Sequence, residues 1–282
     1  MKTPKEIELY PGLSSAYHAS SLFPETFIDP SSDQLADMWQ DIMGEPAKII
    51  DGLLGVMHIP NGTKYHSLIS VDLCDVVRKT CESFMSLEGL EVEAAGHEYS
   101  YGRPFGIHGD DEIIKKIVQG IMVQDLVEPV DNIEEIHEIL LDMRQSGAII
   151  MANTSTLPGC ERATLKFMNT YLKDAFDGIL LPRNHDGNGK ITKGMAKIAV
   201  YKEIELLDGH AHIRHTQHID DAPHHIRGSR EAAQELGITN HFDATPLYPW
   251  NRDHTDMNHT ETPLEAFIQA YETFERINKH GR

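Results

Sequence analysis

The sequence has few cysteines, no long apolar run and few basic residues for its length. The three cysteines, Cys74, Cys81 and Cys160, are odd in number and show none of the paired spacings of zinc ligands, which favours the reducing environment of the cytoplasm. No apolar run approaches the ~18 residues needed to cross a membrane. No basic stretch followed by an apolar one opens the sequence, so we expect neither a membrane partner nor a signal peptide.

Acidic residues outnumber basic ones by 44 to 25, which gives a formal net charge of −19. A protein that binds a phosphate backbone needs Lys and Arg to displace counterions, so a nucleic-acid polymer is not expected as a partner. A small anionic substrate is compatible with this charge because a metal ion can supply local positive charge. The 282 residues suffice for one elaborate domain or two small ones, and a homo-oligomer is equally compatible with the sequence.

Apolar runs alternate with stretches of helical periodicity from residue 66 onward. We expect strands at 67–71, 148–152, 178–181 and 212–219. We expect helices at 76–87, 110–121, 133–143 and 160–172, a further one from Lys193 and a last one ending near Gly237. Strands that alternate with helices of about 10–15 residues predict an α/β fold with a mainly parallel sheet and right-handed crossovers. Residues 1–65 are mixed, with several prolines.

Polar side chains follow three of the predicted strands. They are Asp72 with Asp75, then Asn153-Thr154-Ser155, then Asp220-Asp221, and a lysine, Lys193 or Lys197, precedes the last pair. Because the carboxyl ends of parallel strands share one edge of a sheet, these clusters can converge. A carboxylate nucleophile, a hydroxyl or amide donor, a lysine and an acid pair that holds Mg²⁺ are the groups that phosphoryl transfer needs. The simpler interpretation is that the Asp220-Asp221 pair only marks a turn.

The order of these motifs resembles the haloacid dehalogenase-like (HAD) superfamily over roughly residues 66–255. Within it, the sequence looks most like the deoxyribonucleotidase-type phosphatases, whose helical cap follows the first motif. The first motif would be Asp72-Leu73-Cys74-Asp75-Val76-Val77, the return from cap to core Asp125-Leu126-Val127-Glu128-Pro129-Val130, the third motif Lys193-Gly194 or Lys197, and the fourth Asp220-Asp221.

The resemblance implies a Rossmann-like HAD core of residues 66–78 and 125–282, a small helical cap of residues 79–124 and an N-terminal extension, residues 1–65, without an assigned role. It implies a Mg²⁺-dependent phosphohydrolase that acts on a small phosphomonoester, a 5′-nucleotide included, through an aspartyl-phosphate on Asp72. The implied metal ligands are Asp72, Asp220, Asp221 and the backbone carbonyl of Cys74. The implied phosphate-binding groups are Asn153, Thr154, Ser155 and Lys193 or Lys197, and Tyr101 and Arg103 in the cap would hold the base and sugar.

Two departures from the family pattern leave alternatives open. Cys74 stands where the family has an aspartate that protonates the leaving group, and a thiol is a poor substitute for a carboxylate. The second motif aligns either at Ala152-Asn153, without a hydroxyl, or at Thr154-Ser155, with one. A first motif at Asp51-Gly52 is a lower-ranked register, because Ile49 then takes the nucleophile position. The rival functions are a degenerate fold that binds a phosphorylated ligand or a protein partner with little turnover, and an enzyme that cleaves carbon–phosphorus or carbon–halogen bonds.

Histidines are crowded at His210, His212, His215 and His218. Alternation along a strand puts His215 on the face opposite the other three, so a compact zinc site is hard to build and we expect solvated or edge histidines. Residues 184–195 imitate a calcium loop, but Met195 occupies the position of the acidic twelfth ligand. A tight turn is the preferred interpretation there.

Overall fold

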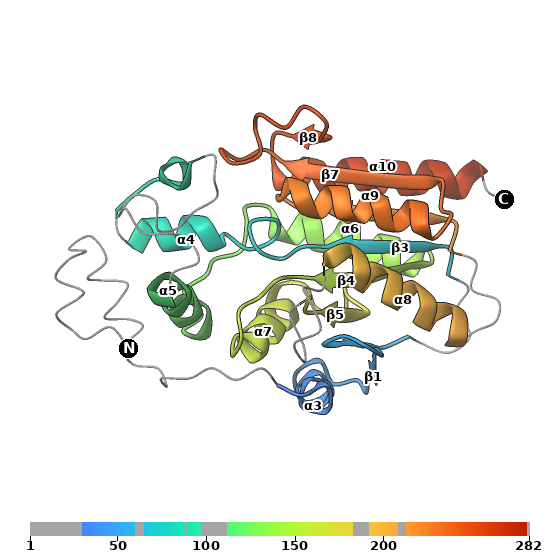
Figure 1. The fold of residues 1–282 in the computed structure, drawn as a ribbon, viewed down its shortest axis with the longest axis horizontal. Coiled ribbons are helices and arrows are strands. Elements are labelled where there is room, and N and C mark those ends of the chain that lie inside the picture. Colours follow the sequence, from blue (N-terminus) through green and yellow to red (C-terminus); the bar gives the residue numbers. More distant parts are fainter. Residues whose placement is uncertain are drawn as a thin grey trace.

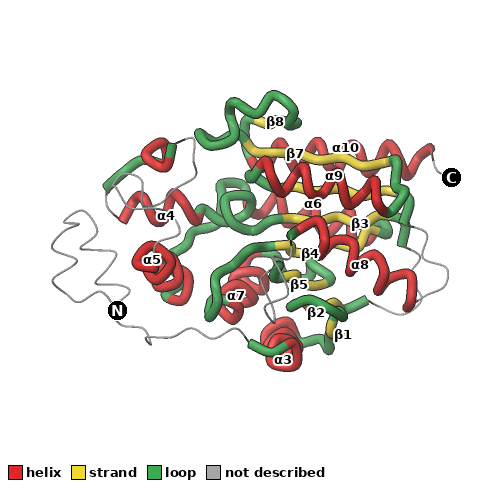
Figure 2. The backbone as a smooth tube through the Cα atoms, viewed as in Figure 1, coloured by secondary structure: helices red, strands yellow, loops and turns green. Residues whose placement is uncertain are grey.

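Eight strands among the described residues form one mixed sheet with helices on both faces (Figures 1 and 2). The computed structural model describes residues 30–59, 65–87, 89–96, 112–182, 192–207 and 213–280. The strands are β1 (Lys48–Ile49), β2 (Gly55–Met57), β3 (Ser67–Val71), β4 (Ala148–Asn153), β5 (Gly178–Leu180), β6 (His215–Ile219), β7 (Asn240–Pro246) and β8 (His259–Thr260). Their order is β1-β2-β5-β4-β3-β6-β7-β8; the six from β5 to β8 run parallel, and β1 and β2 are antiparallel. The predicted α/β fold, with a parallel Rossmann-like core flanked by helices, is confirmed.

Two groups of helices cover the two faces of the sheet (Figure 1). One face carries α8 (Lys193–Leu207) and α9 (Pro223–Glu235), and the other carries α3 (Ser32–Met43), α6 (Ile133–Gln145), α7 (Glu161–Tyr171) and α10 (Pro263–His280). A third group lies beyond the end of β3 and consists of α4 (Thr80–Leu87), η2 (Val92–Ala95) and α5 (Glu112–Val123). Of the helices described, none is at once long enough and apolar enough to span a membrane.

Side chains of the central strands alternate between the two faces. Leu68 in β3 packs in the apolar cluster that includes α8, whereas Ile69 and Val71 pack in the larger cluster that includes α6, α7 and α10. In β4, Ile149 packs in the cluster that includes α8, and Ile150 packs in the larger cluster. Because helices cover both faces, these strands are almost continuously apolar, and that made them recognisable in the sequence.

The register of the central strands places their ends side by side. Val71 of β3 lies opposite both Ala152 of β4 and Ile219 of β6. The residues that follow these three along the chain are Asp72, Asn153 and Asp220. Strand pairing alone therefore brings the first residue of each predicted polar cluster to one edge of the sheet.

Residues 30–57 are continuous with the core. Ser31 and Gln34 form a capping box that begins α3, and Gly44, with φ 83°, ends it in the left-handed region. Leu35 and Trp39 of this helix are buried in the same cluster as β3 and α6. The antiparallel hairpin of β1 and β2 then extends the sheet beyond β5.

Helices α4 and α5 form a separate apolar cluster. Phe84 of α4 and Ile117 of α5 are fully buried in it, together with Cys160 and Trp250 from segments next to the sheet. These helices fall within the range predicted as a cap, residues 79–124, and they are attached to the core through apolar contacts at its carboxyl edge. The domain boundaries stay a prediction.

The crossing of α8 and α9 depends on a glycine next to Lys193. A Cβ at Gly194 would collide with the carbonyl group of Gly228 in α9, whereas a Cβ at Gly228 would meet nothing within 4 Å. We expect Gly194→Ala to lower the free energy of unfolding by about 1–3 kcal/mol, because α8 must move away from α9. Gly228→Ala is the matched control and should leave stability unchanged or raise it by up to about 1 kcal/mol. Urea denaturation of both variants measures the difference, and equal stabilities would contradict the close approach.

Candidate active site

A lysine bridges two aspartates at the carboxyl edge of the sheet. Lys193 Nζ lies 2.7 Å from Asp72 Oδ2 and 2.7 Å from Asp220 Oδ2. All three side chains are buried, with exposures of 2%, 5% and 0%. The bridge joins the ends of β3 and β6 to the first residue of α8, so three segments distant in the sequence meet in one ion pair.

Backbone and side-chain hydrogen bonds orient the bridge. The Leu73 N–H donates to Asp72 Oδ1 at 2.8 Å, and the Ala222 N–H donates to Asp220 Oδ1 at 2.9 Å. Asn153 Nδ2 donates to the backbone carbonyl of Lys193 at 3.0 Å and to Ser70 Oγ at 3.0 Å. The amide of Asn153 thereby fixes the start of α8 against β3 and β4, which holds Lys193 in place.

The charges of the acid pair differ. Burial favours the neutral form of Asp220, but the Lys193 ammonium together with His225 and His218 outweighs burial and holds the pKa of Asp220 well below its usual range. Burial and then the neighbouring Asp220 raise the pKa of Asp221 well above its usual range. Burial lowers the pKa of Lys193, but Asp220 and Asp72 raise it by more, so the pKa lies above its usual value. The site thus contains a charged Asp220 and a charged Lys193 at neutral pH, beside an Asp221 whose carboxyl group keeps its proton to a higher pH than usual.

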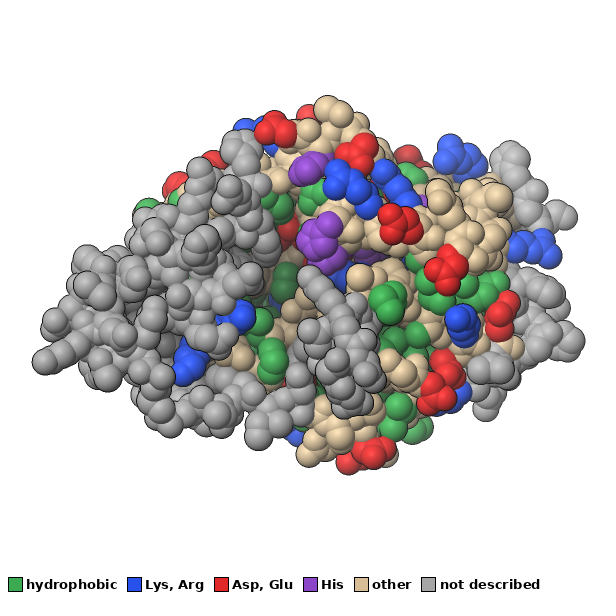
Figure 3. All heavy atoms as spheres, in the orientation of Figure 1, with side chains coloured by type: hydrophobic (Ala, Val, Ile, Leu, Met, Phe, Trp, Pro, Cys, Tyr) green, Lys and Arg blue, Asp and Glu red, His purple; other side chains and the backbone are tan. Residues whose placement is uncertain are grey.

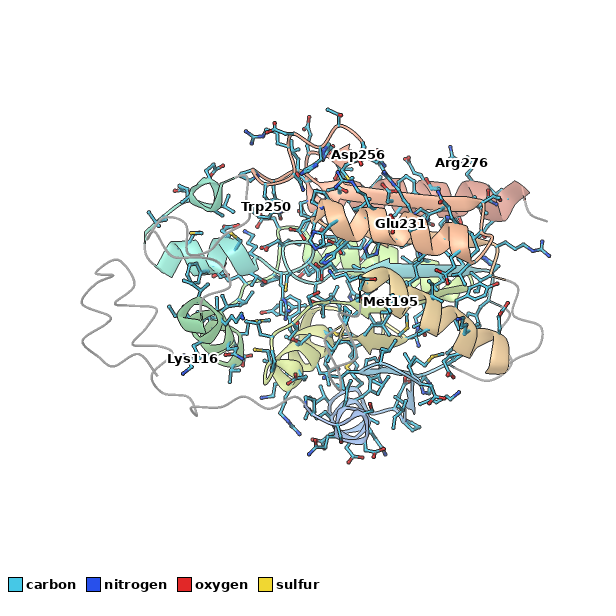
Figure 4. The ribbon with its side chains drawn as sticks, viewed as in Figure 1. Lys116, Met195, Glu231, Trp250, Asp256 and Arg276 are labelled. Atoms are coloured by element: carbon cyan, nitrogen blue, oxygen red, sulfur yellow. The ribbon has the colours of Figure 1, made fainter. Side chains whose placement is uncertain are left out.

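Trp250 and Asn251, rather than the lysine, donate hydrogen bonds to Asp221. Trp250 Nε1 donates to Asp221 Oδ2 at 2.8 Å, and Asn251 Nδ2 donates to the Asp221 backbone carbonyl at 2.9 Å. Trp250 in turn stacks on Tyr248, with ring centroids 4.6 Å apart and an interplanar angle of 3°. Figure 4 shows Trp250 at the end of the sheet that faces α4. Asp221 therefore connects the site to the aromatic pair that packs against α4 and α5.

Cys74 contacts an arginine that the sequence did not single out. Arg78 Nη2 donates to Cys74 Sγ at 3.1 Å and to Thr156 Oγ1 at 2.7 Å, and Nη1 donates to Thr164 Oγ1 at 3.1 Å. Arg78 is 2% exposed, and no carboxylate of the described residues forms an ion pair with it. Burial raises the pKa of Cys74, although Arg78 opposes the shift, so the group is a thiol at neutral pH.

The second-motif residues have different positions. Thr154 is fully buried, and its Oγ1 lies 3.8 Å from Cys74 Sγ and 3.4 Å from Thr156 Oγ1. Ser155 is exposed and lines a cavity. Of the two alignments, the one at Thr154-Ser155 puts hydroxyl groups beside Cys74 and the cavity.

A cavity of about 230 Å³ opens beside the bridge. Its polar wall contains Asp72, Cys74, Ser155, Thr156, Asp221 and His225, and its apolar wall contains Ile114, Val118 and Met122 of α5. In Figure 3, histidine side chains border a hollow near the middle of the molecule. A small anion in this cavity would lie between the aspartates at the sheet edge and helix α5.

Lys197 lies one turn further along α8 and points elsewhere. Its Nζ donates to Ser229 Oγ at 2.9 Å and lies 3.5 Å from His241 Nδ1. The structure therefore brings Lys193, and not Lys197, to Asp72 and Asp220. The alternative first motif at Asp51 lies in the exposed turn between β1 and β2, and strands β5 and β4 separate that hairpin from β3 and β6.

The expectation of solvated or edge histidines is wrong for His215 and His218. Strand β6 lies between β3 and β7, so His215 is 1% and His218 0% exposed. They face opposite sides of the sheet, as predicted: His215 Nδ1 lies 3.2 Å from Ser67 Oγ, and His218 Nε2 lies 3.2 Å from Asp220 Oδ2. His210, His212, Tyr101, Arg103 and residues 184–191 are outside the described residues.

The burial of Lys197 gives a prediction about pH. Desolvation lowers its pKa to about 7, although Asp243 opposes the shift. The unfolded chain keeps this proton up to the ordinary lysine pKa of about 10.4. The buried lysine therefore lowers the free energy of unfolding by its full amount below pH 7, and this penalty shrinks as the pH rises from 7 to about 10.4. We expect Lys197→Met to raise the free energy of unfolding by a few kcal/mol, on the order of 2–4, at pH 6–7 and by little at pH 10.

The control for this prediction is Lys202→Met on the exposed side of the same helix. Urea denaturation from pH 6 to pH 10 should show no pH-dependent difference between Lys202→Met and the wild type. If Lys197→Met raised the free energy of unfolding by the same amount at every pH in this range, Lys197 would be charged in the folded protein.

His225 was also missed as a site residue. It lies in the first turn of α9, and its Nδ1 is 3.2 Å from Asp220 Oδ1. The available signal was Pro223: a proline that begins a helix puts the residues just after it in the turn that faces the preceding strand end. Arg78 and Thr156 were missed although they lie within a few residues of Cys74 and Ser155, whereas Trp250 reaches the site through packing between distant segments, which no local pattern indicates.

Comparisons with known proteins give no family assignment from sequence. No known protein family matches the chain, and no curated protein matches it. Solved structures with similar arrangements include a candidate beta-phosphoglucomutase from Bacteroides vulgatus (TM-score 0.41, 14% identity, covering 88% of this chain and 98% of that one). A second is a HAD-superfamily hydrolase of subfamily IA from Geobacter sulfurreducens (TM-score 0.41, 15% identity, covering 75% of this chain and 98% of that one). A third is a haloacid dehalogenase-like family hydrolase from Xanthomonas campestris (TM-score 0.38, 12% identity, covering 77% of this chain and 100% of that one). At these identities and TM-scores the likeness says nothing about the reaction, so a function has to be argued from the side chains.

Proposed function

We propose that the chain is a metal-dependent phosphohydrolase that releases phosphate from a small phosphomonoester through an aspartyl-phosphate on Asp72. One observation carries the proposal: Lys193 Nζ lies 2.7 Å from both Asp72 and Asp220, where β3 and β6 end beside a cavity. A carboxylate nucleophile held by a fixed cation is the minimum that phosphoryl transfer through an aspartate requires.

The reaction has two steps. An Asp72 carboxylate oxygen attacks phosphorus, the bond between phosphorus and the leaving oxygen breaks, and the leaving alkoxide takes up a proton. Water then attacks the phosphorus of the aspartyl-phosphate and loses a proton, so phosphate departs and the Asp72 carboxylate is restored. Lys193 keeps its charge because its pKa is raised, and it neutralises phosphoryl oxygens in both steps.

Hydroxyl groups at the edge of β4 would bind the phosphoryl oxygens. Ser155 is exposed to the cavity, whereas Thr154 is buried next to Cys74. Asn153 acts through Lys193, because its amide donates to the backbone of that lysine. We therefore assign Ser155 to the substrate, Thr154 to the positioning of Cys74, and Asn153 to the positioning of Lys193.

The donor atoms fit a divalent cation. One carboxylate oxygen each of Asp72 and Asp220 and one ring nitrogen of His225 lie within 4.8 Å of one another. Asp72 and Asp220 would hold the cation with the Cys74 backbone carbonyl, and Asp221 would orient the site through Trp250. The resemblance to HAD enzymes implies Mg²⁺. When bound, the cation neutralises phosphoryl oxygens and aligns them for attack.

The size and lining of the cavity support a small phosphomonoester as the substrate. About 230 Å³ accommodates a small phosphorylated metabolite, and the apolar side of α5 suits a flat or apolar group next to the phosphate. A 5′-nucleotide is the substrate that the resemblance implies, with α4 and α5 as the cap and Tyr101 and Arg103 as contacts to base and sugar.

A phosphatase screen with two matched lysine variants tests the function. Nucleotides and sugar phosphates would be assayed for phosphate release with Mg²⁺ and with EDTA. We expect EDTA to abolish release, Lys193→Met to lower it by about 10²–10³-fold because phosphoryl charge is no longer neutralised, and Lys197→Met to keep it within tenfold. Saturable ligand binding without any phosphate release would overturn the proposal in favour of the binding-protein rival. Equal losses in both variants would remove the specific role of Lys193.

A further inference from the structure

The third group within reach of a cation at this site is an imidazole. Among the described residues, Asp72, Asp220 and His225 form the one group whose ligand atoms converge within 4.8 Å. Two carboxylates with a histidine differ from the all-oxygen set that Mg²⁺ selects. The donor atoms therefore bear on which metal binds as well as on where it binds.

The position of His225 suits a ligand. The first turn of α9 carries it, and Nδ1 lies 3.2 Å from Asp220 Oδ1, the oxygen that does not face Lys193. The ring lines the cavity and is 19% exposed, so a cation can reach it. Its neighbour His224 lies with its ring centroid 3.9 Å away and also lines the cavity, but it is exposed and does not belong to the converging group.

A second observation concerns His218 on the other side of Asp220. This histidine is fully buried, its Nε2 is 3.2 Å from Asp220 Oδ2, and its Nδ1 makes no hydrogen bond with the described residues. A buried polar group without a partner costs free energy unless an ion or water completes its contacts. Asp220 is thus flanked by an imidazole at each oxygen, and one of the two, His225, belongs to the converging group.

We propose that His225 is a direct metal ligand and that the site selects a first-row transition cation such as Co²⁺ or Zn²⁺ over Mg²⁺. Imidazole nitrogen binds Co²⁺ and Zn²⁺ readily, whereas Mg²⁺ favours carboxylate, carbonyl and water oxygens. The inference rests on the proposed function in one respect, namely that Asp72 and Asp220 hold a divalent cation.

Metal binding by the full chain, freed of metal with a chelator, tests the inference without any assay of activity. Calorimetric titrations with CoCl₂ and MgCl₂ give the ratio of the two affinities. In His225→Gln we expect the ratio to fall by about tenfold or more, because nitrogen coordination is lost. In His225→Asp it should fall further, because the site becomes all-oxygen. His224→Gln is the matched control and should keep the wild-type ratio.

Proton NMR of the wild type loaded with Co²⁺ gives a readout that needs no variant. A histidine ligand should give a strongly shifted, exchangeable imidazole N–H resonance, and its absence would overturn the inference even if the variants failed to fold. An unchanged ratio in His225→Gln would overturn it as well, and would leave His225 as a group that only positions Asp220.

The two proposals can fail separately. Suppose that Mg²⁺ supports phosphate release and that His225→Gln leaves the ratio of Co²⁺ to Mg²⁺ affinity unchanged. The inference about His225 would then be wrong, and the phosphohydrolase proposal would stand. A metal ratio that depends on His225, without phosphate release from any substrate, would keep the metal site and remove the phosphohydrolase.

Discussion

Asp72→Asn is expected to lower phosphate release by more than about 10³-fold, because an amide is nearly isosteric with the carboxylate but cannot attack phosphorus at a useful rate. The fold should persist, since Lys193 keeps its contact with Asp220 and the Leu73 N–H can still donate to the amide oxygen. Steady-state rates measured with each substrate found in the screen, together with circular dichroism of the variant, check both statements.

Asp51→Asn is the matched control for the nucleophile. Asp51 is exposed in the hairpin turn between β1 and β2, so its amide should leave turnover within tenfold of the wild type. The assignment of Asp72 fails if the folded Asp72→Asn protein retains turnover within that range. A loss confined to Asp51→Asn would revive the other register of the first motif.

Cys74→Asp is expected to raise turnover, by as much as the ~10²–10⁴-fold that general acid–base catalysis typically contributes. The buried Arg78 guanidinium, which donates to the Cys74 thiol at 3.1 Å, would gain a carboxylate partner without rearrangement. The gain should be largest for alkyl phosphates, whose alkoxide needs a proton, and smaller for p-nitrophenyl phosphate, whose leaving group scarcely needs one. Cys74→Ser is the matched control: it keeps a small polar group, supplies no carboxylate and should give no gain.

The fate of the covalent intermediate is a second measure of Cys74→Asp. If hydrolysis of the aspartyl-phosphate is slow for lack of a base, rapid quenching should trap phosphorylated protein in the wild type and little in the variant. Lower activity of Cys74→Asp on every substrate would favour an enzyme that cleaves carbon–phosphorus or carbon–halogen bonds. The binding-protein rival would gain if neither form released phosphate.

The sheet edge could be predicted because burial leaves a strong local pattern. Ser67–Val71 and Ala148–Asn153 are covered on both faces, so each reads as an apolar run with a polar residue at its end. Parallel pairing then requires Asp72 and Asp220 to meet. The choice between Lys193 and Lys197 could not be made in this way, because residues four apart share a helix face. It depends on where α8 begins relative to β3, which Asn153 fixes from another strand.

Other features depend on neighbours that the sequence does not identify locally. Strands β1 and β2 contain two and three residues, too few for periodicity, and exist because β5 offers an antiparallel partner. His215 and His218 are buried because β6 is an inner strand and helices cover both faces of the sheet. The capping box at Ser31 and Gln34 begins α3. It is a local signal from which this helix can be predicted within the mixed first 65 residues.

The contact between Trp250 and Asp221 gives the chain an optical reporter of its site. The sequence has two tryptophans: Trp39 is buried among apolar side chains of the core, while the Trp250 indole donates to a carboxyl group that lines the cavity. Indole emission responds to nearby charge, so the fluorescence of a Trp39→Phe protein would follow events beside Asp221, such as cation binding. In a Trp250→Phe protein, the fluorescence of Trp39 would instead report whether the core is folded.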